Sequence, residues 1–232
     1  MTLLVAIETS TDLASVALLY HNDLSVLTAT GSATHSFSIL PMIQQLLRAA
    51  DVTLAACDAI AFGAGPGSFT GVRTACGVAQ GLAFGADIPV VAINTLEAMA
   101  LACHEATGAQ RVLPVLDARM GEVYWAQYDF SNGLAITLAP SLSAPAMVVP
   151  SGPVTACGNG VNVLSTQATN SDLLHDARAD IMPNAAQIAE LARRALKSGL
   201  QVHARDAQPI YLRNQVALTT AERVQKKLQE AV

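Results

Sequence analysis

Charged and aromatic residues are scarce in this sequence. Of its 232 residues only 13% are charged and 4% aromatic, whereas 52% are hydrophobic. So much apolar surface can offset the entropy lost on folding, which excludes intrinsic disorder. Basic residues are scarcest early on, because residues 1–100 hold two basic and seven acidic side chains while residues 101–232 hold eleven of each. An acidic half is a poor surface for a phosphate backbone, so we expect any nucleic acid to be met through a partner.

Long hydrophobic runs are also missing. The mean hydropathy of +0.39 is high, but polar and charged residues interrupt the most apolar stretch, 78–103. A membrane-spanning helix needs about 18 apolar residues in succession. Residues 1–7 are too short for a signal peptide and lack its basic flank. We therefore expect a cytoplasmic protein that makes no membrane contact.

Cysteine and histidine do not occur at metal-binding spacings. The four cysteines form no C-x-x-C pair, so we expect them to be reduced and buried. They are Cys57, Cys76, Cys103 and Cys157. His35 and His104 have no second histidine three or four residues away, and Ser68 lies one residue out of register with G-x-S-x-G. The sequence predicts no metal site and no catalytic residue, although chain order alone leaves a serine triad open.

The first half of the chain alternates between strand and helix patterns. Strands are predicted at 3–8, 15–20, 24–30, 59–63 and 90–93. Apolar residues at three- and four-residue spacing predict helices at 37–50, 71–85 and 95–104. Ser36 or Ser38 could cap the first of these helices with Pro41 in its first turn, and Thr95 could cap the third.

Residues 105–110 are predicted to connect the two halves of the chain. The second half has a similar pattern of strands and helices. Strands are predicted at 112–116, 122–128, 134–138 and 155–157, and helices at 185–197 and 219–230. A Pro/Ser-rich stretch at 140–153 is expected to be a loop. Each half has a β-meander followed by further helices and strands, which is consistent with a duplicated α/β architecture.

A glycine-rich loop joins the strand at 59–63 to the helix at 71–85. Glycines at 63, 65, 67 and 71 surround Pro66, and they permit positive φ angles and close backbone approach. The N–H groups that open the following helix favour an anion such as phosphate. The loop matches neither the Walker A pattern nor G-x-G-x-x-G. A phosphate site and a tight turn without ligand both remain open.

The helix after this loop carries three glycines on one face. Gly77, Gly81 and Gly85 are four residues apart, and each costs up to about 1 kcal/mol relative to alanine inside a helix. Close approach of another backbone would offset that cost. The neighbour could be the protein's own sheet, which is the default interpretation, or a helix of a second subunit.

Two polar turns have more than one interpretation. Glu8 and the hydroxyls after it could hold a metal-bound phosphate at a β-hairpin turn, but the turn lacks glycine and a plain polar turn is favoured. Residues 117–125 contain Asp117, Arg119 and Glu122 around Gly121. They form either a hairpin with an internal ion pair or a surface for a partner or nucleotide.

Taken together, these stretches resemble the TsaB (YeaZ) family. The matching segments are 6–10, 35–36, 40–42, 58–63, 65–73, 77–83, 117–125 and 209–213. The resemblance implies an actin-like (ASKHA, ribonuclease H-like) α/β fold of two subdomains with mixed sheets. The subdomains would be 1–104 and 105–232, and the terminal helix would pack back on the first.

The resemblance also implies a function without chemistry of its own. Such a subunit would bind and activate the transferase TsaD in threonylcarbamoyladenosine synthesis on tRNA, with TsaE joining the pair, and would form a homodimer when TsaD is absent. The partner would hold ATP or ADP and the metal, and tRNA would be reached only indirectly. A metal-dependent glycoprotease-like peptidase, an actin-fold kinase or ATPase, and a direct tRNA-binding module are the alternatives.

The resemblance assigns two sets of residues. The partner would meet the helices at 37–50 and 71–85, through Ile39, Ile43, Leu46, Leu47, Arg73, Thr74, Gly77, Val78, Gly81 and Gly85. A nucleotide or phosphate at the subunit boundary would contact the glycine-rich loop, through Gly65, Gly67, Ser68, Thr70 and Gly71.

Overall fold

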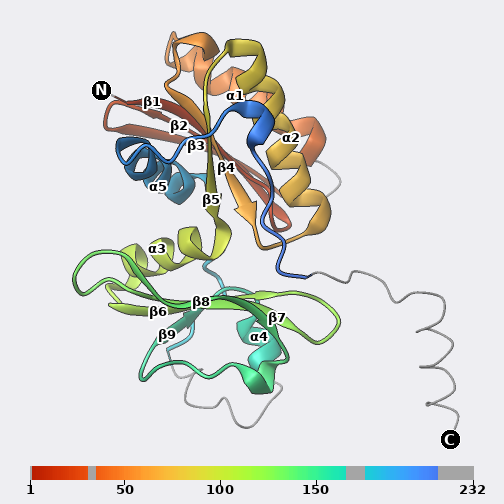
Figure 1. The fold of residues 1–232 in the computed structure, drawn as a ribbon, viewed down its shortest axis with the longest axis vertical. Helices are drawn as coiled ribbons and strands as arrows, with labels where there is room; N and C mark the ends of the chain where they lie inside the picture. The colour runs from red at the N-terminus through yellow and green to blue at the C-terminus, as the bar shows by residue number, and fades with distance from the viewer. Residues whose placement is uncertain (1, 31–34, 166–175, 214–232) are drawn as a thin grey trace, which may run out of the picture.

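A computed structural model describes residues 2–30, 35–165 and 176–213 of the chain. Two α/β subdomains lie one above the other, and the chain crosses between them at the junction of β5 (Val90–Asn94) and α3 (Thr95–Thr107) (Figure 1). None of the described helices is long and apolar enough to cross a membrane.

The first sheet has five strands in the order β3-β2-β1-β4-β5. β1 (Leu3–Glu8), β2 (Leu13–Tyr20) and β3 (Asp23–Thr30) are antiparallel, whereas β4 (Ala59–Gly65) and β5 run parallel to β1. All six residues of β1 are buried because helices cover both faces of the sheet.

Alternate residues of β1 enter two different hydrophobic clusters. Val5 and Ile7 pack beneath α1 (His35–Ala49) and α2 (Phe69–Ala86), while Leu4 and Ala6 pack beneath α5 (Ala185–Lys197). This period of two follows from the pleat of a strand, which points successive side chains to opposite faces.

The second sheet has the order β8-β7-β6-β9. Its strands are β6 (Arg111–Asp117), β7 (Val123–Asp129), β8 (Ala135–Ser143) and β9 (Thr155–Cys157). Pairing is antiparallel from β6 to β8 and parallel between β6 and β9. This repeats the order β3-β2-β1-β4 of the first sheet. The duplicated α/β architecture is therefore present in the topology. Helix α3 packs on one face of this sheet and α4 (Val161–Leu164) on the other.

The predicted elements are all present within the described residues, with four local corrections. Asn94, not Thr95, caps α3, because its side chain accepts hydrogen bonds from the N–H groups of Leu96 and Glu97. α1 begins at His35, so Ser36 and Ser38 lie within the helix and not at its N-cap position, and Pro41 lies inside the helix rather than in its first turn. β8 extends into the stretch expected to be loop, and α3 continues to Thr107. The predicted helix at 219–230 lies outside the described residues.

The chain returns to the first subdomain after residue 184. Helix α5 packs on the first sheet, and Val202 pairs with Val90 at the edge of β5. Residues 185–207 thus pack on the first subdomain, which the boundary at 104/105 does not anticipate, whereas Arg213 reaches the second subdomain. All four cysteines are free and buried, as predicted, and burial raises the pKa of the Cys57 thiol to about 11.

Candidate functional site

The glycine-rich loop packs tightly against the turn that follows β1. The N–H of Ser68 donates to the carbonyl of Ser10 at 2.7 Å, and the Thr9 hydroxyl donates to the carbonyl of Gly71 at 2.7 Å. A Cβ on Gly71 would overlap the Thr9 carbonyl, and one on Gly67 would overlap the backbone of Ser10. The loop glycines are therefore required by close backbone approach, and this requirement needs no ligand.

A cleft of about 330 Å³ separates the two subdomains. One wall is formed by the turn at 10–12 and the loop at 66–69, the other by residues 116–120 with Asn159, and residues 210–213 also line the cleft. Of the five predicted phosphate contacts, Gly67 and Ser68 line this cleft. Gly65 and Gly71 are buried and do not line it, and neither does the exposed Thr70.

Glu8 is enclosed between the strands rather than directed into the cleft. Its Oε1 accepts a hydrogen bond from the N–H of Ser10 at 2.5 Å, while its Oε2 has no partner among the described residues. A Cβ on Gly63 would overlap this carboxyl group. Complete burial raises its pKa, and hydrogen bonds from Ser10, Thr9 and Thr95 oppose that shift only partly. The carboxyl group is not placed to hold a metal-bound phosphate.

The turn between β6 and β7 forms part of the opposite wall. Arg119, Met120 and Gly121 have successive positive φ angles of 63°, 56° and 75°. Asp117 accepts the N–H of Arg119 at 2.7 Å and pairs with its guanidinium at 3.3 Å. The internal ion pair of the first interpretation is therefore present. Trp125, nearby, is a core residue whose indole N–H donates to Ser143.

The outer face of α1 and α2 differs in detail from the predicted partner surface. Ile39, Ile43 and Leu46 are buried under the helix against the first sheet, so they cannot form a surface, and their assignment to the interface is wrong. Leu47 and Val78 are half-buried and pack against the same core.

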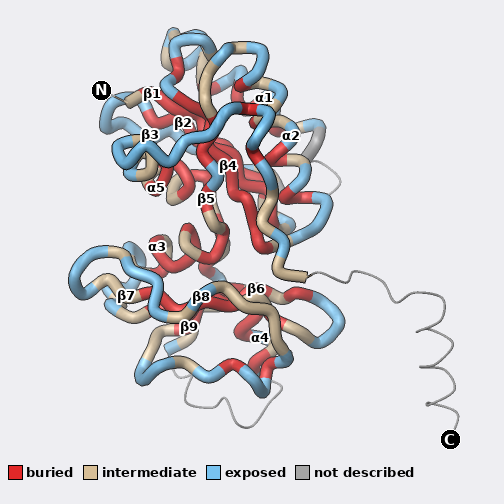
Figure 2. The backbone as a smooth tube through the Cα atoms, in the orientation of Figure 1, coloured by how far each residue is buried: buried red, intermediate tan, exposed pale blue. Residues whose placement is uncertain are grey.

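The glycines of α2 point outward. Gly77, Gly81 and Gly85 are exposed, and among the described residues a Cβ on any of them would meet no atom within 4 Å beyond the backbone of its own helix. The default interpretation, packing against the protein's own sheet, is therefore wrong. Arg73 is exposed and Thr74 half-buried on the same face. Figure 2 shows this side of α1 and α2 as a largely exposed surface.

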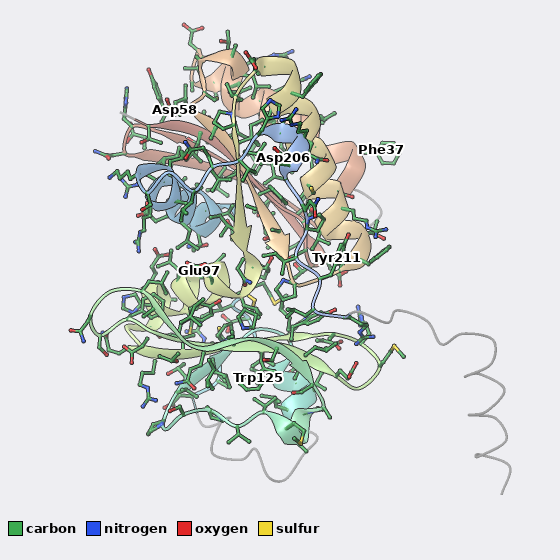
Figure 3. The ribbon with its side chains drawn as sticks, viewed as in Figure 1. Phe37, Asp58, Glu97, Trp125, Asp206 and Tyr211 are labelled. Atoms are coloured by element: carbon green, nitrogen blue, oxygen red, sulfur yellow. The ribbon has the colours of Figure 1, made fainter. Side chains whose placement is uncertain are left out.

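Sequence reasoning missed the large apolar side chains on this surface. Phe37 and Phe84 are 81% and 74% exposed, and Leu40 is 43% exposed. Phe37 points away from the body of the molecule (Figure 3). The helical period of α1 could have separated Phe37 and Leu40 from the buried Ile39, Ile43 and Leu46, because the two sets lie on different faces. We name the exposed residues Phe37, Leu40, Arg73, Gly77, Gly81, Phe84 and Gly85 the outer helix face.

Two stacked subdomains with matching sheet orders and a cleft between them define a protein of the actin-like α/β class. A family model described as TsaD, tRNA N6-adenosine threonylcarbamoyltransferase, matches residues 26–221. The tRNA threonylcarbamoyladenosine biosynthesis protein TsaB of Escherichia coli is 37% identical over 92% of this chain and 96% of its own.

Two further comparisons agree. The protein of the same name from Haemophilus influenzae is 39% identical over 92% of this chain and 94% of its own. The structure of YeaZ from Pseudomonas aeruginosa superposes with a TM-score of 0.83 at 36% identity, covering 91% of this chain and all of that one. The chain belongs to the TsaB (YeaZ) family.

Proposed function

We propose that this chain is a non-catalytic, cytoplasmic accessory subunit in threonylcarbamoyladenosine synthesis on tRNA, where it binds and activates a TsaD-type transferase. The observation that supports this most directly is the outer helix face, which exposes three glycines beside large apolar side chains. Relatives with matching length are named as biosynthesis proteins of this nucleoside.

The outer helix face has the chemistry of a helix-docking surface. Three exposed helix glycines cost up to about 1 kcal/mol each relative to alanine, and no contact with the described part of the chain offsets that cost. A partner helix could approach the α2 backbone closely there. Burying Phe37 and Phe84 would each contribute about 2 kcal/mol. Exposed apolar side chains around small residues are typical of protein interfaces rather than of free surface.

The same face can serve a second copy of the chain. In a two-fold symmetric dimer the same surface patch of both copies forms the interface. The exposed glycines would let the α2 helices of the two copies approach each other closely. We therefore propose a homodimer through the outer helix face when the TsaD-type partner is absent. The two assemblies would exclude each other because they use the same residues.

The chemistry is proposed to reside in the partner. Glu8 is enclosed between strands. Asp117, which does line the cleft, is already paired with Arg119. We propose that the partner holds ATP or ADP and the metal, and that TsaE joins the pair. Because the first half of this chain is acidic, we propose that the partner rather than this chain binds tRNA. Gly67 and Ser68 are the residues of the glycine-rich loop that could contact a nucleotide in the complex.

The test of docking is Gly81→Leu with Ala106→Leu as its matched control. Both place leucine at an exposed helix position, but Ala106 lies on α3, away from the outer helix face. We expect Gly81→Leu to keep the fold and to weaken binding of the TsaD-type partner at least about tenfold, because the side chain keeps the partner backbone away. Ala106→Leu should bind normally. Equal binding by both variants would contradict the proposed interface.

The accessory role itself is tested by omission. The transfer reaction is measured with each purified subunit left out, and the isolated chain is titrated with nucleotide and with zinc and iron salts. We expect no transfer by this chain alone and stimulation of the partner. Stoichiometric metal or tight ATP binding by the isolated chain would instead favour a peptidase or an actin-fold kinase or ATPase.

A further inference from the structure

The last described segment, 207–213, runs along α2 and ends at the second subdomain (Figure 1). It is neither helix nor strand. At its start the carbonyl of Ala207 accepts hydrogen bonds from the Gln80 amide at 2.9 Å and the Cys76 thiol at 3.7 Å. In its middle the N–H of Ile210 donates to the carbonyl of Ala64 at 2.7 Å. These contacts attach the segment to α2 and β4.

Tyr211 connects this segment to the outer helix face. Its hydroxyl accepts a hydrogen bond from Arg73 Nε at 2.7 Å. The Arg73 guanidinium carbon lies 3.5 Å from the centre of the Phe69 ring and 5.5 Å from that of Tyr211. Arg73 is thus held on α2 by two aromatic rings, one of which belongs to the segment.

Arg213 connects the segment to the second subdomain. Its Nη2 donates to Glu122 Oε2 at 2.6 Å and to the carbonyl of Ala118 at 3.2 Å, and its Nη1 lies 2.9 Å from the sulfur of Met120. All three acceptors lie in the β6–β7 turn. The Arg213 side chain is only 15% exposed, so this contact is better shielded from water than a surface ion pair.

The turn that Arg213 holds has a backbone that needs support. Arg119 and Met120 are non-glycine residues with positive φ, a conformation that costs roughly 1 kcal/mol or more per residue. A strained turn is kept only where contacts with the surrounding structure stabilise it. Arg213 supplies such contacts at both ends of this turn, to Ala118 and to Glu122. The segment therefore lines the cleft and joins its two walls, with one end on α2 and the other on the β6–β7 turn.

We propose that residues 207–213 form a strap that couples the outer helix face to the β6–β7 turn, so that a protein partner docking on α2 changes how firmly the turn is held over the cleft. The shared residue is Arg73, which is exposed on that face and bonded to the strap. The partner half of this inference rests on the proposed function, whereas the coupling within the chain does not. Because linkage is reciprocal, loosening the strap at either end loosens the other.

The first experiment measures amide hydrogen exchange in the free, full-length chain. Glu122→Gln removes the charge that Arg213 pairs with, and Glu190→Gln is the matched control, since it weakens arginine pairs that lie within α5 alone. We expect Glu122→Gln to accelerate exchange about three- to tenfold both in residues 118–123 and in residues 69–76. The control should change neither segment. Acceleration confined to 118–123, or none, would overturn the strap.

Tyr211→Phe tests the coupling from the other end. It keeps the ring and removes only the hydroxyl that accepts from Arg73. We expect faster exchange in residues 118–123 of this variant as well, although Tyr211 makes no hydrogen bond to the turn itself. An unchanged turn in Tyr211→Phe would contradict reciprocal coupling.

The same measurement with the TsaD-type partner separates the two proposals. In the wild-type chain we expect the partner to slow exchange in α2 and also in residues 118–123. In Glu122→Gln we expect slowing in α2 alone. Absence of slowing in wild-type α2 would refute docking, while the free-chain result would still decide the strap. If the partner slows exchange in α2 of the wild-type chain but not in residues 118–123, the proposed response of the turn to the partner is wrong.

Discussion

The glycines between Gly63 and Gly85 fall into two groups that differ in the space around them. Those of the loop are packed, because Thr9, Ser10 and the Glu8 carboxyl occupy the space that a side chain would need. Those at the outer face of α2 are open, with no atom within 4 Å of an added Cβ. The packed glycines are explained within the chain. The open ones have no such contact with the described residues, and for that reason we propose that a second molecule docks there.

Gly71→Ala should have the largest effect, because its Cβ would overlap the backbone carbonyl of Thr9. Backbone cannot move aside as a flexible side chain can. We expect a loss of about 3 kcal/mol or more in the free energy of unfolding, measured by urea denaturation. A loss below about 1 kcal/mol would show that a side chain fits at Gly71 in the first turn of α2, and the contrast with the exposed glycines later in the same helix would then be wrong.

Glu8→Gln should change the pH dependence of stability. The pKa of Glu8 is raised in the folded protein, so its contribution is fully present below the unfolded pKa and is lost as pH rises through the folded pKa. In that window the wild-type free energy of unfolding should fall with a slope approaching about 1.4 kcal/mol per pH unit from this group.

The glutamine variant should lack this component of the slope, since it cannot ionise and still offers an oxygen to the N–H of Ser10. Denaturation curves of both proteins from acid to mildly alkaline pH give the comparison. Parallel pH profiles would mean that Glu8 is not held neutral beside Gly63.

Gly81→Ala should have the smallest effect and the opposite sign to Gly71→Ala. The two substitutions are identical and lie in the same helix. We expect Gly81→Ala to stabilise the isolated chain by roughly 0.5–1 kcal/mol, because alanine restricts the unfolded backbone and has space in the folded one. Thermal denaturation at low protein concentration, where the proposed homodimer would dissociate, measures it. Destabilisation would mean that Gly81 has a contact within the chain.

Periodicity along the chain predicted most of the elements. The strands of both meanders alternate or are continuously apolar, and α5 appears within the same bounds that its amphipathic pattern predicts. These patterns are local, and burial of the apolar face keeps them in the native structure. One error occurs where two local signals compete: Asn94 and Thr95 are adjacent candidate caps, and only the observed hydrogen bonds distinguish them.

The interface residues show what periodicity alone could not resolve. The family resemblance predicts Ile39, Ile43 and Leu46 as partner-interface residues, yet they lie against the first sheet. An amphipathic helix has one apolar stripe for its own core. We therefore expect a partner to contact the apolar residues that remain exposed on α1, namely Phe37 and Leu40.

The sequence by itself determined the α/β class, the duplicated order of elements, the glycine-rich loop and the family. Only the tertiary structure decided which glycines are packed, where Glu8 lies, and that residues 207–213 meet the β6–β7 turn. The physical reason is distance along the chain. Local spacing encodes which face of a helix or strand is apolar, whereas contacts such as Arg213 with Glu122 depend on how two subdomains are stacked.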